Sequence, residues 1–75
     1  MSKESQFLIY CMERYRYSKK LSGIELSDLF DKYNVYDYII SFFESLHTMW
    51  ENLIIQDIDE FIAESQKIKQ NLSAL

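Results

Sequence analysis

Apolar residues recur every three or four positions along much of this chain, which is the spacing of amphipathic helices. A first helix is predicted at about 4–19, where one face carries Phe7, Leu8, Cys11, Met12 and Tyr15. A second is predicted at about 23–33, with the apolar stripe Leu26, Leu29, Phe30 and Tyr33. Each helix has one apolar face, so both should pack side-on against a shared core.

Two local signals set the ends of the second predicted helix. Ser22 stands three residues before Glu25, the spacing of a capping box in which each side chain bonds the other residue's backbone N–H. Leu21 and Leu26 flank this cap as a hydrophobic staple. Asn34 tolerates the left-handed conformation that often follows a helix, so the helix is predicted to end there.

A third helix is predicted at about 36–47 and a fourth at about 58–72. The third is apolar on nearly all faces and should be central, with Ile39, Ile40, Phe42, Phe43 and Leu46. The fourth is expected to start at Asp57 as N-cap, with Glu60 three positions later, and to point Ile58, Phe61, Ile62, Ile68 and Leu72 inward. The periodicity breaks between them, so residues 48–56 are expected to be irregular or extended.

Composition supports one small helical domain over residues 1–75. The chain has a single glycine and no proline, whereas an all-β fold needs turn residues every 8–12 positions. At 48% hydrophobic and 27% charged it resembles a folded globular protein rather than a disordered one. The fold class expected is therefore all-α, a compact bundle of about four helices.

Charge is distributed unevenly. Residues 1–20 carry five basic and two acidic residues, whereas residues 21–75 carry three basic and ten acidic ones. The basic first helix is interpreted as a solvated face, with self-association as the alternative. A helix-turn-helix would place residues 36–47 in the major groove, but this segment contains no Lys or Arg, so DNA binding through it is not expected.

The inventory of reactive side chains points away from an enzyme, cofactor or metal site. His47 and Cys11 are the only histidine and cysteine, and zinc needs three or four such ligands. One glycine rules out a phosphate-binding loop, and Cys11 on an apolar face is expected to be a small buried hydrophobe. The lone cysteine and the absence of a long apolar run predict a cytoplasmic protein without a membrane segment.

Five blocks in a fixed order resemble a known family. They are residues 7–15 (FLIYCMERY), 21–30 (LSGIELSDLF), 32–40 (KYNVYDYII), 46–48 (LHT) and 57–62 (DIDEFI). Together they resemble the small bacterial domain-of-unknown-function family numbered thirty-seven ninety-one, over residues 7–62. After the block at residues 46–48 (LHT), the family usually continues with glutamine and glycine, whereas this chain has Met49 and Trp50.

The resemblance implies a partner rather than a mechanism. Genes of that family often neighbour proteins resembling ADP-ribosyltransferases, which implies an antitoxin-like or regulatory protein that occludes or stabilises such a partner. A protein-binding module is therefore the expected function. The alternatives are a small nucleic-acid-associated regulator, which would use Arg14, Arg16, Lys19 and Lys20 on the first helix, and a structural homo-oligomer such as a homodimer, which a thin core favours.

The candidate partner-binding residues are His47, Thr48, Trp50 and Tyr36. The first three fall in the expected connector, and connectors on a rigid scaffold often carry binding groups. Tyr36 is one of six tyrosines, too many for all to be buried in so small a core, and exposed Tyr and Trp are enriched at protein interfaces. Trp50 is expected either to fill the space between the last two helices or to be an exposed anchor for a partner. We favour the first of these predictions.

Overall fold

The fold contains five helices. A computed structural model describes the backbone of residues 1–74 and the side chains of residues 1–69. The helices are α1 (Lys3–Lys19), α2 (Gly23–Lys32), α3 (Val35–Ser41), α4 (Phe43–Leu46) and α5 (Glu51–Ala74). Residues 1–74 contain no strand, so the predicted all-α class is confirmed.

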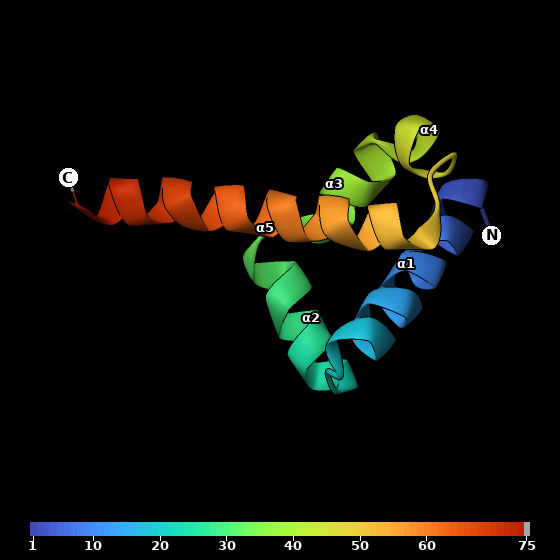
Figure 1. Ribbon diagram of the computed structural model, residues 1–75, viewed down its shortest axis with the longest axis horizontal. Coiled ribbons are helices and arrows are strands. Elements are labelled where there is room, and N and C mark those ends of the chain that lie inside the picture. Colours follow the sequence, from blue (N-terminus) through green and yellow to red (C-terminus); the bar gives the residue numbers. More distant parts are fainter. Residues whose placement is uncertain (75) are drawn as a thin grey trace.

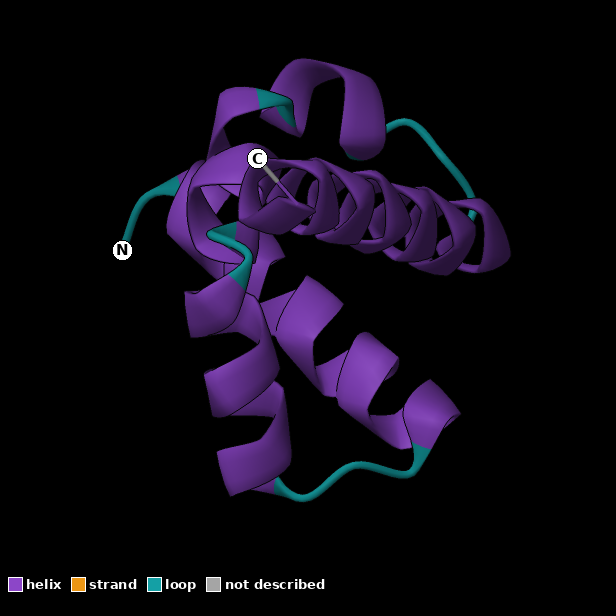
Figure 2. Cartoon of the chain, turned by 90° about the vertical axis from the view of Figure 1, so that its left-hand side faces the viewer, coloured by secondary structure: helices purple, strands orange, loops and turns teal. Residues whose placement is uncertain are grey.

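The long helix α5 lies between two pairs of shorter helices. In Figures 1 and 2, α1 and α2 form a V on one side of α5, and α3 and α4 lie on the other side. The last turns of α5 project beyond the other helices, which explains why the molecule is elongated at 41 × 26 × 23 Å. Because α5 touches α1 and α3, it joins the two pairs.

The predicted signals at the start and end of α2 are present. The Ser22 hydroxyl accepts a hydrogen bond from the Glu25 N–H at 3.1 Å, and the Glu25 carboxylate accepts one from the Ser22 N–H at 2.9 Å. The same bonds lower the pKa of Glu25. Asn34 adopts the predicted left-handed conformation, with φ of 58°. Lys20, which no sequence signal singled out, does the same at the end of α1.

The predicted third helix is wrong as a single element, because it is divided at Phe42. The backbone of Phe42 leaves helical geometry, with φ of −107° and ψ of 23°, and α4 continues along a new direction. A straight helix with apolar residues on all sides cannot bury all of them. The bend leaves Ile39 and Leu46 buried in the core and brings Phe43 against α1.

The predicted connector over 48–56 and the helix start near Asp57 are also wrong, because α5 begins at Glu51. Ile54 and Ile58, four residues apart, both face the core, whereas Leu53, the residue before Ile54, is 47% exposed. The apolar run Leu53-Ile54-Ile55 is therefore part of a helix, with Ile54 on its buried face. Towards the end of α5, Ile68 is 59% exposed rather than buried, and the predicted inward position of Leu72 lies outside the described side chains.

Every helix contributes to one buried core. Its members are Cys11 and Tyr15 from α1, Leu26 and Phe30 from α2, Tyr33 from the turn, Val35 and Ile39 from α3, Leu46 from α4, and Ile54, Ile58 and Ile62 from α5. The expectation that Cys11 is a buried hydrophobe is confirmed, since it is 1% exposed. A core shared in this way leaves none of the short helices stable by itself.

Carboxylates on α5 bond to tyrosines of other helices at the edge of this core. The Tyr15 hydroxyl donates to Asp59 Oδ1 at 2.6 Å, and Lys19 Nζ lies 2.5 Å from Asp59 Oδ2. The Tyr38 hydroxyl donates to Asp57 Oδ1. Asp57 is thus not a helix cap. It lies inside α5, and these bonds fix how α5 is rotated against α1 and α3.

The buried thiol of Cys11 should be unreactive in the folded protein. Burial raises its pKa from the ordinary 9.0 to about 12, so the reactive thiolate is suppressed. Since the unfolded chain releases this proton first, the free energy of unfolding should fall as the pH rises above about 9. We expect Ellman's reagent to label Cys11 only as fast as the fold opens. Labelling at the rate of an unfolded control would contradict this.

Removing the Tyr15 hydroxyl should loosen the contact between α1 and α5. Tyr15→Phe keeps the buried ring but deletes the bond to Asp59, and we expect it to cost about 1 kcal/mol, a melting shift of several degrees. Tyr17→Phe is the matched control, because Tyr17 lies two residues away and is 75% exposed. Equal melting temperatures for the two variants would show that the Tyr15–Asp59 bond contributes nothing.

Candidate protein-binding surface

The segment that joins α4 to α5 is short and held by hydrogen bonds. The His47 N–H donates to the Phe43 carbonyl at 2.9 Å, and the Met49 N–H donates to the Leu46 carbonyl at 3.0 Å. The Thr48 hydroxyl donates to the Ser45 carbonyl at 2.8 Å. The side chains of this turn are therefore presented from a defined backbone rather than from a free loop.

His47 is exposed and fixed in place by Phe43, one turn before it. Its Nδ1 lies 2.7 Å from the Phe43 carbonyl oxygen, so the ring donates to the carbonyl of the first residue of α4. The imidazole also stacks on the Phe43 ring, with centroids 4.6 Å apart. This is the structural role expected of a histidine near a helix C-terminus, and it leaves the outer face of the ring open to solvent.

Trp50 does not plug the core, so the favoured prediction for this residue is wrong. Its side chain is 83% exposed, and its carbonyl accepts the first helical bond of α5 from Ile54 at 3.0 Å. Trp50 directly precedes α5, and its exposed side chain points away from the bundle. Met49 and Ile54 pack against the core on either side of it.

Aromatic rings from α1 and α4 lie next to this turn. Phe7 contacts Phe43 edge-on with centroids 5.4 Å apart, and Phe7 is also stacked against Tyr10 at 6.1 Å. With His47 on the other side of Phe43, four rings form a continuous row. Sequence reasoning did not select Phe7, Tyr10 or Phe43. Their spacings within each helix were visible, but only folding brings α1 beside α4.

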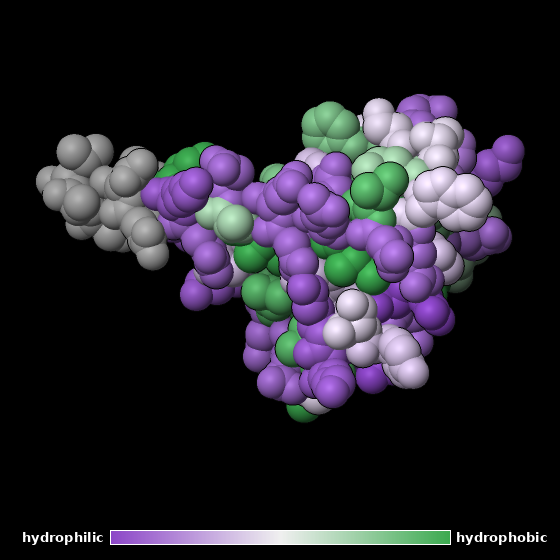
Figure 3. All heavy atoms as spheres, viewed as in Figure 1, coloured by the Kyte–Doolittle hydropathy of each residue, from purple (hydrophilic) through white to green (hydrophobic). Residues whose placement is uncertain are grey.

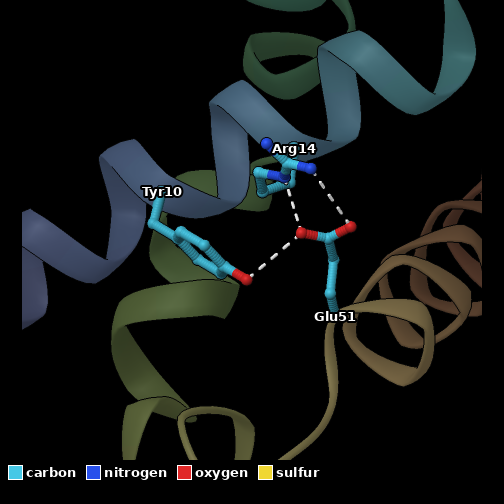
Figure 4. A network of polar contacts seen from close by, with 3 residues as sticks. All are labelled: Tyr10, Arg14 and Glu51. Carbon is cyan, nitrogen blue, oxygen red and sulfur yellow. Dashed lines mark hydrogen bonds and ion pairs between the residues drawn. The ribbon is translucent and has the colours of Figure 1, made fainter.

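Glu51 ties the beginning of α5 to α1 (Figure 4). Arg14 Nε donates to Glu51 Oε1 at 2.5 Å, and a second guanidinium nitrogen lies 3.4 Å from Oε2. The Tyr10 hydroxyl donates to Glu51 Oε1 at 3.3 Å. Desolvation and the neighbouring carboxylate raise the pKa of Tyr10. These bonds hold the start of α5, which directly follows Trp50, against Tyr10 and Arg14 of α1.

We call this region the connector surface and define it by Phe7, Tyr10, Phe43, His47, Thr48 and Trp50. Figure 3 shows hydrophobic and weakly polar side chains gathered at the α3–α4 end of the molecule, while strongly polar ones cover the outer side of α5. The structure thus brings together three of the four predicted binding residues.

Tyr36, the fourth predicted binding residue, lies elsewhere. It is in the first turn of α3, where its ring contacts Phe30 of α2 edge-on at 5.5 Å. Figure 1 shows the turn between α2 and α3 at one end of the bundle and the connector between α4 and α5 at the other. Tyr36 is half-buried against the core and does not share a surface with Trp50.

The basic residues of α1 do not form an open cationic face. Arg14 pairs with Glu51 and Lys19 with Asp59, both carboxylates of α5. Arg16 lies 3.8 Å from Glu13 on its own helix. Two basic residues of the first helix are therefore paired with the acidic last helix within one chain, while Arg14, Lys19 and Lys20 are all exposed, as expected of a solvated face.

Comparison with known proteins identifies the family but no activity. The family described as "Protein of unknown function (DUF3791)" matches residues 6–65. The chain belongs to this family. The match confirms the resemblance carried by the five sequence blocks. No curated protein and no solved structure matches the DUF3791 chain significantly.

The described residues of this DUF3791 protein contain neither a cluster of potential metal ligands nor a helix that could span a membrane. Among the described side chains, no three His, Cys, Asp or Glu residues come together as a potential metal site. None of the described helices is both long enough and apolar enough to cross a membrane.

His47→Ala separates a structural role from a binding role. If the imidazole mainly caps α4, its loss should lower the melting temperature by a few degrees, consistent with about 1 kcal/mol in a small domain, and leave partner binding intact. This is the result we expect from the Nδ1 bond and the Phe43 stacking. Unchanged melting together with weaker partner binding would instead make His47 a binding residue.

Proposed function

We propose that this DUF3791 protein is a protein-binding module that contacts its partner through the connector surface. The observation that carries the proposal is Trp50, a large aromatic side chain left 83% exposed on an ordered turn. Tryptophan is among the residues most enriched at the energetic centres of protein interfaces. A monomeric protein of this size gains nothing in stability from holding such a side chain in water.

The order of the turn adds support. Binding costs free energy whenever side chains and loops must be immobilised. Here the turn is already held by the Thr48 and Met49 hydrogen bonds, and Glu51 is tied to Arg14 on α1. Phe7 and Phe43 are likewise packed against each other before any partner arrives. A partner that docks here would meet a largely preformed surface.

The finer role that we propose is antitoxin-like or regulatory. The family resemblance implies a neighbouring-gene partner similar to ADP-ribosyltransferases, and a small protein with one aromatic docking surface suits a role in occluding or stabilising such a partner. The nucleic-acid alternative has less support, because Arg14 and Lys19 are already paired with carboxylates of α5. A homodimer is the remaining alternative and is tested below.

Trp50→Ala should weaken partner binding without unfolding the protein. The neighbouring-gene product is co-expressed, and its affinity for the wild type and the variant is measured by titration calorimetry. We expect a loss of about tenfold or more, equivalent to about 1.4 kcal/mol, with little change in melting temperature because the side chain is exposed. Tyr17→Ala is the control, since Tyr17 is a similarly exposed aromatic near the far end of α1. Equal affinities for all three proteins would refute the proposal.

A further inference from the structure

The segments on both sides of the connector contribute acidic side chains but no Lys or Arg. Between Lys32 and Lys67 the sequence contains seven carboxylates and no Lys or Arg. This stretch makes up α3, α4, the connector and the first two-thirds of α5. These segments therefore contribute an excess of negative charge to the molecule.

Four of the seven carboxylates already have partners inside the fold. Glu51 binds Arg14, Asp59 binds Lys19 and Tyr15, and Asp57 accepts from Tyr38. Glu64 lies 3.5 Å from Lys67, one turn along α5. Asp37, Glu44 and Glu60 are exposed, and no ion pair joins any of them to a described basic side chain.

Two of these carboxylates, Glu44 and Glu60, stand next to aromatic residues in the sequence. Glu44 follows Phe43 in α4 and is exposed. Phe42, 53% exposed, contacts Tyr38 at 5.0 Å, and Tyr38 stacks on Phe61 at 4.0 Å. Glu60 directly precedes Phe61 and is close enough to Tyr38 to help raise the pKa of its phenol, after desolvation and Asp57. The rings of Phe42, Tyr38 and Phe61 thus form a second aromatic cluster, which begins one residue before Phe43 of the connector surface and lies near Glu60.

We propose that the partner docks here through a basic amphipathic segment, and this inference rests on the proposed function. Apolar side chains of the segment would cover Trp50, Phe43 and Phe42. Its Lys or Arg side chains would meet Glu44 and Glu60, and an Arg or Lys can also lie over an exposed aromatic face. An acidic partner surface would be repelled at the same positions.

A second copy of this chain fits the surface less well. Its most basic element is α1, and there Arg14 and Lys19 are already bound to carboxylates of their own chain. Arg16 has Glu13 nearby. The chain as a whole carries a net charge of −4, so two copies would repel each other at the acidic face. The structure therefore favours a different, cationic partner.

A displayed library of random peptides tests the charge of the occupant. Peptides are selected on the folded wild-type protein and counter-selected on Trp50→Ala, so that only binders of the connector surface remain. Binding of individual peptides is followed through the emission of Trp50, the only tryptophan. We expect these peptides to be enriched in Lys and Arg together with large apolar residues, and their affinity to fall as salt is raised.

Charge reversal shows whether the carboxylates near Trp50 are responsible for the binding of basic peptides. Glu44→Lys should lower the affinity of the protein for the selected peptides roughly fivefold or more. Asp28→Lys is the control, because it makes the same change in net charge at an exposed position on α2. Equal effects of the two variants would overturn the proposal, since only the net charge would then matter. Both variants should melt close to the wild type.

Three other outcomes would also overturn it. Peptides that need Trp50 but carry no excess of Lys or Arg would refute the basic partner and leave the proposed protein-binding function standing. Failure to find any peptide that depends on Trp50 would refute both. Light scattering at twice the 9.1 kDa chain mass, together with Trp50 emission shielded from iodide, would identify a second copy as the occupant.

Discussion

The fold depends on burying one stripe of α5 between two pairs of shorter helices. Ile54, Ile58 and Ile62 recur at four-residue spacing and are all buried. Each such side chain contributes about 1.5–3 kcal/mol when fully buried. Helices as short as α3 and α4, with seven and four residues, are not stable in water alone. They persist because Ile39 and Leu46 complete the same core that α5 crosses.

The polar contacts around that core determine how the helices are aligned. Glu51 and Asp59, eight residues apart on α5, bind Arg14 and Lys19 on α1, which are five residues apart. Asp57, on another face of α5, binds Tyr38 of α3. The bonds to Glu51 and Lys19 are largely exposed and contribute little free energy individually. Their value is that they admit only one register between α1 and α5.

The same arrangement has a consequence for recognition. Glu51 and Asp59 of α5 neutralise Arg14 and Lys19 of α1, whereas Asp37, Glu44 and Glu60 form no ion pair with a described basic side chain. Trp50 is held at the edge of this region by the first turn of α5. An acidic surface with rigid aromatic anchors combines electrostatic steering with desolvated contact area, two separate contributions to specific binding.

Local sequence determined the features that depend on neighbouring residues. The Ser22–Glu25 cap, the left-handed Asn34 and the buried face of Cys11 were all predictable, because caps and helical stripes are set within a few residues. The ordered blocks also identified the family. Only tertiary packing decided where α5 starts, why the chain bends at Phe42, and which way Trp50 points. An apolar run such as residues 53–55 is compatible with several local structures, and only α1 and α3, packed against Ile54 and Ile58, select one of them.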